Sequence, residues 1–285
     1  MTEPLAGHRD FPVPAPVAAA ARAWLAGPGQ PPPARPAATV MLVRDGEPGV
    51  EVFVIRRASS MAFAPDMTVF PGGGVDPRDA DPQVPWTGPG PQEWARSLGV
   101  GSDEARELVI AAAREVFEEC GVLLAGPHAD SVVSDLTDPV WDRERDALLS
   151  REQSFAELLI RRRLVLRTDL LRLRAHWITP ECEPRRYDTW FFAALMPEGQ
   201  RADDRSSEAA AAGWLTPATA LAAHQDGSAV MLPPTVVMME QLAAAGSAAA
   251  LLGERPRVRP VMPWPVEQDG SVVMRSPVGP DGHGV

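Results

Sequence analysis

The stretch that decides the fold is REVFEECGV, residues 114–122. At helical spacing Glu115, Glu118 and Glu119 share one face, because residues i, i+3 and i+4 are neighbours on a helix. Apolar residues fall on the opposite side, which is typical of a helix with one buried face. Three like charges repel one another, and Arg114 can compensate part of this repulsion by pairing with Glu118 at i+4. A divalent metal would compensate more, and crowded carboxylate oxygens favour Mg²⁺ or Mn²⁺ over zinc or copper.

The same residues resemble the second half of the Nudix box, R-E-U-x-E-E-x-G-U, in which U is aliphatic. FPGG at residues 70–73 resembles the opening of that box. The full pattern, G-x5-E-x7-R-E-U-x-E-E-x-G-U, places the arginine fourteen positions after the glycine. Here Arg114 follows Gly73 by 41 positions, so about 27 extra residues interrupt the box. An interrupted box resembles the Nudix subgroup that includes the peroxisomal coenzyme A diphosphatase of animals, and this resemblance covers about residues 37–245.

The resemblance implies a set of catalytic and metal-binding residues. It assigns catalysis to Arg114, Glu115, Glu118 and Glu119, and it assigns the metal to the three glutamates together with a carbonyl of Gly72. Glycine at 72 and 73 lets the backbone approach metal and phosphates, since no side chain intervenes.

Two positions of the family pattern need a substitute in this chain. The pattern asks for an acid eight positions before Arg114, where Arg106 stands, and Glu104 and Glu107 flank that position. Glu208 is the candidate for a carboxylate base on a later loop.

Substrate binding is predicted at Gly72 and Gly73 and at Arg57 and Arg186, because guanidinium groups suit bidentate contacts with phosphate. For these arginines, and for Arg56 and Arg185, a solvated charge at a strand edge is the alternative. Tyr187 and Trp190 either stack on a base or pack in the protein.

Composition limits the class of protein. The chain has 285 residues, a formal charge of −11 and 45% hydrophobic residues, and it contains no lysine. A net-acidic chain of this size predicts a folded domain and argues against a partner that is nucleic acid or an anionic membrane. No apolar run is long enough to span a membrane. We expect a cytoplasmic protein, of bacterial origin from its arginine and alanine bias, and a homodimer is an open alternative to a monomer.

The predicted organisation has three parts. Residues 1–36 form a poorly ordered, Pro/Ala-rich lead with one short helix, residues 37–250 form the Nudix domain, and residues 251–285 form a Pro-rich tail. Within the box, residues 75–101 form a loop-like insert that we expect to be a wall or lid over the substrate. Alternating strands and helices predict an α/β fold, a Nudix-like α/β/α sandwich with a mixed central sheet, the insert and extra helices.

The sequence thus predicts a metal-dependent Nudix pyrophosphohydrolase that cleaves the diphosphate of a nucleoside diphosphate linked to another group. Coenzyme A or acyl-CoA is the leading substrate, and ADP-ribose, NADH or a dinucleotide are alternatives. A non-catalytic, nucleotide-sensing Nudix domain is the other class of function that remains open.

Overall fold

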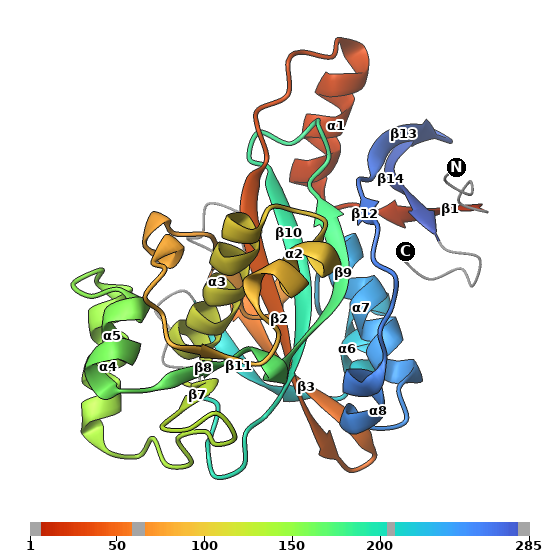
Figure 1. Ribbon diagram of the computed structural model, residues 1–285. Helices are drawn as coiled ribbons and strands as arrows, with labels where there is room; N and C mark the ends of the chain where they lie inside the picture. The colour runs from red at the N-terminus through yellow and green to blue at the C-terminus, as the bar shows by residue number, and fades with distance from the viewer. Residues whose placement is uncertain (1–6, 59–65, 204–208, 279–285) are drawn as a thin grey trace.

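The computed structural model describes residues 7–58, 66–203 and 209–278 and shows a mixed central sheet between helical layers (Figure 1). The strand order is β11-β3-β2-β10-β9-β12, with β4 beside β3 and β5 beside β2. β10 runs parallel to β2 and antiparallel to β9, so the sheet is mixed, as predicted. The strands of this sheet are β2 (Arg35–Gly46), β3 (Gly49–Arg57), β4 (Thr68–Val69), β5 (Gly72–Gly74), β9 (Leu171–Ile178), β10 (Tyr187–Leu195), β11 (Ala209–Leu215) and β12 (Pro260–Val261).

Both faces of the sheet are covered, which confirms the predicted sandwich. Along β2, Val40 and Leu42 face α2 (Pro91–Leu98) and α3 (Ser102–Cys120), whereas Met41 and Val43 face the other layer. A strand that is buried on both faces reads as a continuous apolar run, and β2 does so. The other layer consists of α6 (Pro217–Gln225), α7 (Pro233–Ala244) and α8 (Ala248–Gly253).

Helix α3 carries the acidic segment and has the polarity that the sequence predicts. Its apolar side, including Val116 and Cys120, is fully buried against the sheet. Gly121 ends the helix in the left-handed conformation with φ 68°, a conformation that favours glycine. The helix begins at Ser102, and its N-cap position is held by Gly101, which has no side chain to cap it.

The insert is folded and contains a helix where the sequence predicts a loop. It comprises the short helix η1 (Pro77–Ala80), strand β6 (Trp86–Thr87) and α2. Trp94 of α2 is buried against Phe192, and the indole of Trp190 donates to the Leu98 carbonyl at 3.1 Å. Proline and glycine punctuate this segment, but apolar anchors at helical spacing fix α2 to the core.

A third helical layer packs on the outer side of α3. It consists of α4 (Pro139–Leu149) and α5 (Phe155–Arg162), and a small sheet of β6, β7 (Ala125–Gly126) and β8 (Val165–Arg167) lies beside it. The buried carboxylate of Glu144 on α4 joins the two helices. It accepts hydrogen bonds from Arg161 at 2.9 Å, from Arg162 at 2.8 Å and from Gln153 at 2.8 Å.

Because of Glu144, the free energy of unfolding should decrease as the pH is lowered into the acid range. Burial alone would raise its pKa, but the hydrogen bonds from Arg161, Gln153 and Arg162 outweigh it and lower the pKa from 4.5 to about 2. A depressed carboxylate pKa contributes stability that is present above pH 4.5 and is lost as the pH falls through about 2. We expect this contribution to be about 2 kcal/mol, because solvent around the exposed Arg161 screens part of it. Urea unfolding of wild type and Glu144→Gln between pH 6 and the acid limit measures it. The prediction is contradicted if the difference in free energy of unfolding between wild type and Glu144→Gln does not decrease on acidification.

The segments at the two ends of the described chain form a separate small sheet. Strand β1 (Gly7–Pro12) pairs with β14 (Ser271–Val278), and β14 pairs with β13 (Trp264–Gln268). Helix α1 (Ala15–Ala26) packs on this sheet at the upper end of β9 and β10 (Figure 1). The prediction of a poorly ordered lead is therefore wrong for β1 and α1, which pack against distant segments, whereas the one short helix predicted within the lead is confirmed as α1. Across the described ranges, no helix combines the length and apolar character of a transmembrane span.

Candidate functional site

A cleft of about 1480 Å³ opens beside the acidic face of α3. Strands β2, β9 and β10 supply one side of it through Thr39, Trp177 and Tyr187. The glycine strand β5 and the acidic residues of α3 form one end. The sheet thus brings the two halves of the interrupted box together at one edge of a single cavity.

The glycine strand lies directly against the acidic helix. The Gly72 N–H donates to Glu119 Oε2 at 2.8 Å. A Cβ at position 73 would come within 2.5 Å of Glu115 Oε1, and a Cβ at position 72 would come within 2.5 Å of the Ala38 carbonyl oxygen. Both distances are too short for any side chain. Glycine is therefore needed here for close approach, as the sequence predicts, although the nearest group at position 73 is a glutamate carboxylate.

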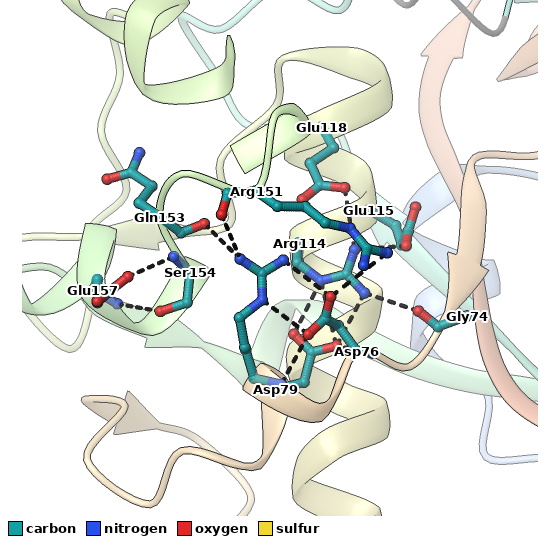
Figure 2. A network of polar contacts seen from close by, with 11 residues as sticks. Gly74, Asp76, Asp79, Arg114, Glu115, Glu118, Arg151, Gln153, Ser154 and Glu157 are labelled. Carbon is teal, nitrogen blue, oxygen red and sulfur yellow. Dashed lines mark hydrogen bonds and ion pairs between the residues drawn. The ribbon is translucent and has the colours of Figure 1, made fainter. Parts of the chain in front are cut away.

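Arg114 is the centre of the polar network (Figure 2). Its guanidinium is 7% exposed and donates to Glu115 at 2.7 Å, to Glu118 at 3.1 Å and to the Gly74 carbonyl at 2.9 Å. The predicted i+4 pair with Glu118 is confirmed. The remaining donors point at Asp79, with Nε to Oδ1 at 3.0 Å and Nη2 to Oδ2 at 3.0 Å.

Asp79 is the acid that the family pattern requires before the arginine. It stands six positions after Gly73, as the G-x5-E half of the pattern asks, and it is 2% exposed. The position eight residues before Arg114, which Glu104 and Glu107 flank, does not supply this acid, because the insert separates the acid from the arginine. Counting forward from Gly73 identifies it, and the interruption lies after residue 79.

Helix η1 holds Asp79 in place. Its N-cap residue Asp76 accepts from the Arg78 N–H at 2.9 Å, and Asp79 in turn accepts from the Asp76 N–H at 2.9 Å, which forms a capping box. The Arg78 guanidinium donates to the carbonyls of Arg151 and Gln153 in the loop between α4 and α5. Figure 2 shows this loop beside the carboxylates of Asp76 and Asp79. The start of the insert therefore couples Arg114 to the third helical layer.

The network around Arg114 contains more carboxylates than cations, and burial changes the pKa values of its members. Burial raises the pKa of Glu115 to about 7, although the Arg114 guanidinium lowers it, and burial likewise raises the pKa of Glu118. Burial would lower the pKa of Arg114, but the Glu115 and Asp79 carboxylates outweigh it and raise the pKa above its ordinary value. A permanently charged arginine is thus shared among three carboxylates, and the surplus of negative charge calls for another cation.

A divalent metal fits this donor set. In the described ranges, no three His, Cys, Asp or Glu side chains already converge on one metal position. However, Glu115, Glu118 and Glu119 line the same end of the cleft, and all three offer the hard oxygen atoms that Mg²⁺ and Mn²⁺ prefer. The glycines at 72 and 73 let the carboxylates of Glu119 and Glu115 approach the backbone of β5 closely. The three glutamates are the residues that would hold a metal here, and the carbonyl of Gly72 as a further ligand stays a prediction.

The two arginines predicted to bind substrate have different positions. Arg57 lines the cleft. Arg186 does not, because its guanidinium donates to the carbonyls of Thr179 at 3.0 Å and of Pro32 at 2.9 Å. The exposed neighbour Arg185 lines the cleft instead. The assignment of Arg186 to substrate binding is therefore corrected to a structural role.

The aromatic candidates also separate. Tyr187 lines the cleft, whereas Trp190 is 2% exposed and stacks on His176 on the α2 side of the sheet. Trp190 is thus a core residue, as its alternative reading held.

The insert contributes less to the cleft than predicted. Only residues 75–78 border it, whereas Trp94 and Leu98 of α2 are buried in the core with α3 and the sheet. The prediction that residues 75–101 as a whole form a wall or lid is therefore wrong. Their apolar side chains belong to the core.

Two further carboxylates are relevant to the predicted general base on a loop that follows α3. Glu208 lies outside the described residues. Glu183 lines the cleft, and its Oε1 atom is buried and accepts no hydrogen bond from the described part of the chain. Burial raises its pKa. No spacing in the sequence marks Glu183, since only the turn between β9 and β10 brings it there.

Comparison with known proteins identifies the family. A family model described as the NUDT19 Nudix domain matches residues 91–242, more than half of the chain, and includes the whole of α3. The solved structure of a NUDIX hydrolase from Alicyclobacillus acidocaldarius is 27% identical. The match covers 79% of this chain and 98% of that chain, with a TM-score of 0.66.

Two curated relatives match at similar identity. The acyl-coenzyme A diphosphatase NUDT19 of Xenopus laevis is 28% identical over 204 residues, which cover 60% of this chain and 54% of the frog protein. The putative nudix hydrolase 7 of Caenorhabditis elegans is 30% identical over 171 residues, which cover 58% of this chain and 46% of the worm protein. The chain therefore spans about half the length of the curated relatives it matches. With the glycine strand, the acidic helix and the Asp79–Arg114 pair assembled at one cleft, the chain belongs to the Nudix hydrolase family, as a domain of the NUDT19 type.

Proposed function

We propose that this protein is a metal-dependent pyrophosphohydrolase that cleaves the diphosphate of a nucleoside diphosphate linked to another group. The observation that carries the proposal is the position of Glu115, Glu118 and Glu119 at the end of a large cleft, against a strand without side chains. A diphosphate placed there would lie beside the carboxylates, in a cleft that the cationic side chains of Arg57 and Arg185 also line. When bound, Mg²⁺ or Mn²⁺ supplies Lewis-acid chemistry to the phosphoryl oxygens.

The residues of the chain hold the reacting groups in position. Arg114, fixed by Asp79, sets the side-chain conformations of Glu115 and Glu118 through its hydrogen bonds. The Gly72 N–H fixes Glu119. Because each carboxylate is held by a hydrogen bond, from Arg114 or from the Gly72 N–H, their positions are set before the substrate arrives, and preorganisation of this kind lowers the barrier to reaction.

Coenzyme A or an acyl-CoA is the substrate that we propose. The frog relative is named an acyl-CoA diphosphatase, the box is interrupted as in that subgroup, and the cleft is larger than the roughly 300–1,000 Å³ usual for small ligands. ADP-ribose, NADH and dinucleotides share the diphosphate and are the competing substrates.

A substrate panel tests both proposals. Purified protein is incubated with CoA, acyl-CoA, ADP-ribose, NADH and diadenosine polyphosphates, each with Mg²⁺, with Mn²⁺ and with EDTA, and the phosphate-bearing products are quantified. We expect two monophosphate products from CoA or acyl-CoA, formed only with metal. Turnover of ADP-ribose alone would reassign the substrate. Binding without turnover across the panel would show a nucleotide sensor instead.

The neighbouring arginines provide a matched pair of variants. Arg185→Ala should raise KM several-fold at unchanged thermal stability, because it removes a cation that borders the cleft and breaks no hydrogen bond or ion pair with another described residue. Arg186→Ala should leave KM unchanged and lower the free energy of unfolding by about 1–2 kcal/mol, because it removes hydrogen bonds to two backbone carbonyls. Steady-state kinetics and thermal unfolding of both variants check this. The opposite pattern would restore Arg186 to the binding site.

A further inference from the structure

The cleft changes character along its length. Its acidic end lies at β5 and α3, whereas its other end is bordered by apolar residues of α1 and of the segments near β13 and β14. Val13, Val17 and Ala20 come from the N-terminal segment, and Pro263 and Met274 come from the C-terminal one. No charged side chain of α1 lines the cleft in the described ranges. The nearest charges in the cleft lining, Glu183 and Arg185, come from the turn between β9 and β10 whose Cys182 packs on α1.

This apolar wall is a built part of the fold. Val17, Ala20, Ala21 and Trp24 recur at helical spacing on one side of α1. Ala21 is fully buried against Met274 of β14 and Cys182 of the turn between β9 and β10. Strand β1, just before α1, pairs with β14 in the register Phe11–Met274. Ala20 is only partly buried and lines the cleft, so the helix presents one side of its packed face to the cavity.

The acidic end and the apolar end together suit a long ligand that has a charged diphosphate in one half and an apolar group in the other. The cleft floor between them carries Phe191 and Trp177 next to Tyr187 and Thr189, so apolar surface continues from the wall toward the diphosphate position. A nucleotide diphosphate fills a volume at the acidic end. In the rest of the cleft, water would contact the apolar residues of the wall. Displacement of this water by an apolar ligand group is favourable in free energy.

We propose that this apolar end is a binding subsite for the fatty-acyl chain of an acyl-CoA, and that Val17 and Ala20 of α1 determine chain-length specificity. The inference rests on the proposed function for the position of the diphosphate. It goes beyond that function by assigning a chain-binding wall to the terminal segments, which lie outside the matched Nudix domain.

Binding without turnover provides the test. In EDTA, we measure the Kd of CoA, butanoyl-CoA and dodecanoyl-CoA by isothermal titration calorimetry, below the micelle concentration of the long chain. Full burial of each methylene is worth roughly a fourfold gain in affinity, so even partial burial should make dodecanoyl-CoA bind about tenfold more tightly than butanoyl-CoA.

Variants of the adjacent residues Ala19 and Ala20 test whether the acyl chain binds at this wall of the cleft. Ala20→Trp fills the cavity and Ala20→Asp places a charge in the apolar wall, so both should reduce the affinity ratio of the two chains to near one. Ala19→Trp and Ala19→Asp are the matched controls, because Ala19 is exposed on the same helix and does not line the cleft. The controls should keep the wild-type ratio, and thermal unfolding of all four reports whether α1 stays packed.

The outcomes separate this subsite from the proposed function. A chain-length effect that Ala20 variants abolish supports the subsite even if the panel with Mg²⁺ shows no hydrolysis, which would overturn only the function. Hydrolysis of CoA with equal affinity for both chains would overturn the subsite and leave the function in place. A chain-length effect that the Ala20 and Ala19 variants change alike would also overturn it, because the chain would then lie elsewhere.

Discussion

Asp79→Ala is expected to lower the free energy of unfolding by about 3–5 kcal/mol, the cost of leaving one member of a buried ion pair without its partner. Asp79 is 2% exposed and takes two of the Arg114 donors, and no water reaches them easily. The guanidinium would stay charged in a site where burial penalises charge. Urea unfolding followed by circular dichroism gives the difference, with the slope checked for unchanged cooperativity.

Asp81→Ala is the control for this change. Asp81 ends the same short helix and accepts only from the Gln83 N–H at 2.8 Å, so its loss should cost little. The double variant Asp79→Leu/Arg114→Met should not recover the stability, because Glu115 and Glu118 then lose the cation that they share. A loss below about 1 kcal/mol for Asp79→Ala would mean that solvent screens the pair after all.

Glu119→Gln is expected to reduce kcat by about a hundredfold or more, the scale of removing one key electrostatic group. Glutamine keeps the shape of the side chain, and its oxygen can still accept from the Gly72 N–H, so the glycine strand should hold its place. Only the negative charge is lost. Product formation with saturating Mg²⁺, measured over a range of substrate concentrations, separates kcat from KM.

Glu104→Gln is the matched variant for this second test. Glu104 lies in the first turn of the same helix, is exposed and does not line the cleft. It should keep the wild-type rate. Equal rates for Glu119→Gln and wild type would remove the catalytic assignment of the acidic face, whatever the substrate.

Much of the fold could be predicted because its signals are local. The limits of β9 and β10 follow from apolar runs that end at proline or at charged turns, and the limits of α3 follow from its periodicity and from Gly121. The faces of α3 were predicted because a helix fixes which side each residue occupies. The domain boundaries at residues 36 and 250 stay predictions.

The parts that could not be predicted depend on contacts between distant residues. Asp79 meets Arg114 only because 34 intervening residues fold into η1, β6, α2 and the start of α3. Residues 185 and 186 are both arginines, and nothing in their neighbourhood shows which one turns inward to Thr179 and Pro32. Strand β1 needs β14 as its partner, and no pattern near residues 7–12 indicates that partner.

The pairing of β1 with β14 also sets a time order for folding during synthesis. Residues 7–12 leave the ribosome early but cannot form their ladder until residues 273–278 have emerged. The central layers can close before that, since β2, β3, α3 and β10 are all made earlier. Closing so long a loop costs chain entropy with no local contacts to offset it. During synthesis, the cleft end formed by β5 and α3 should therefore be folded while the end formed by α1 and β14 is still incomplete. We expect α1 to remain sensitive to protease until β14 has been synthesised and has paired with β1.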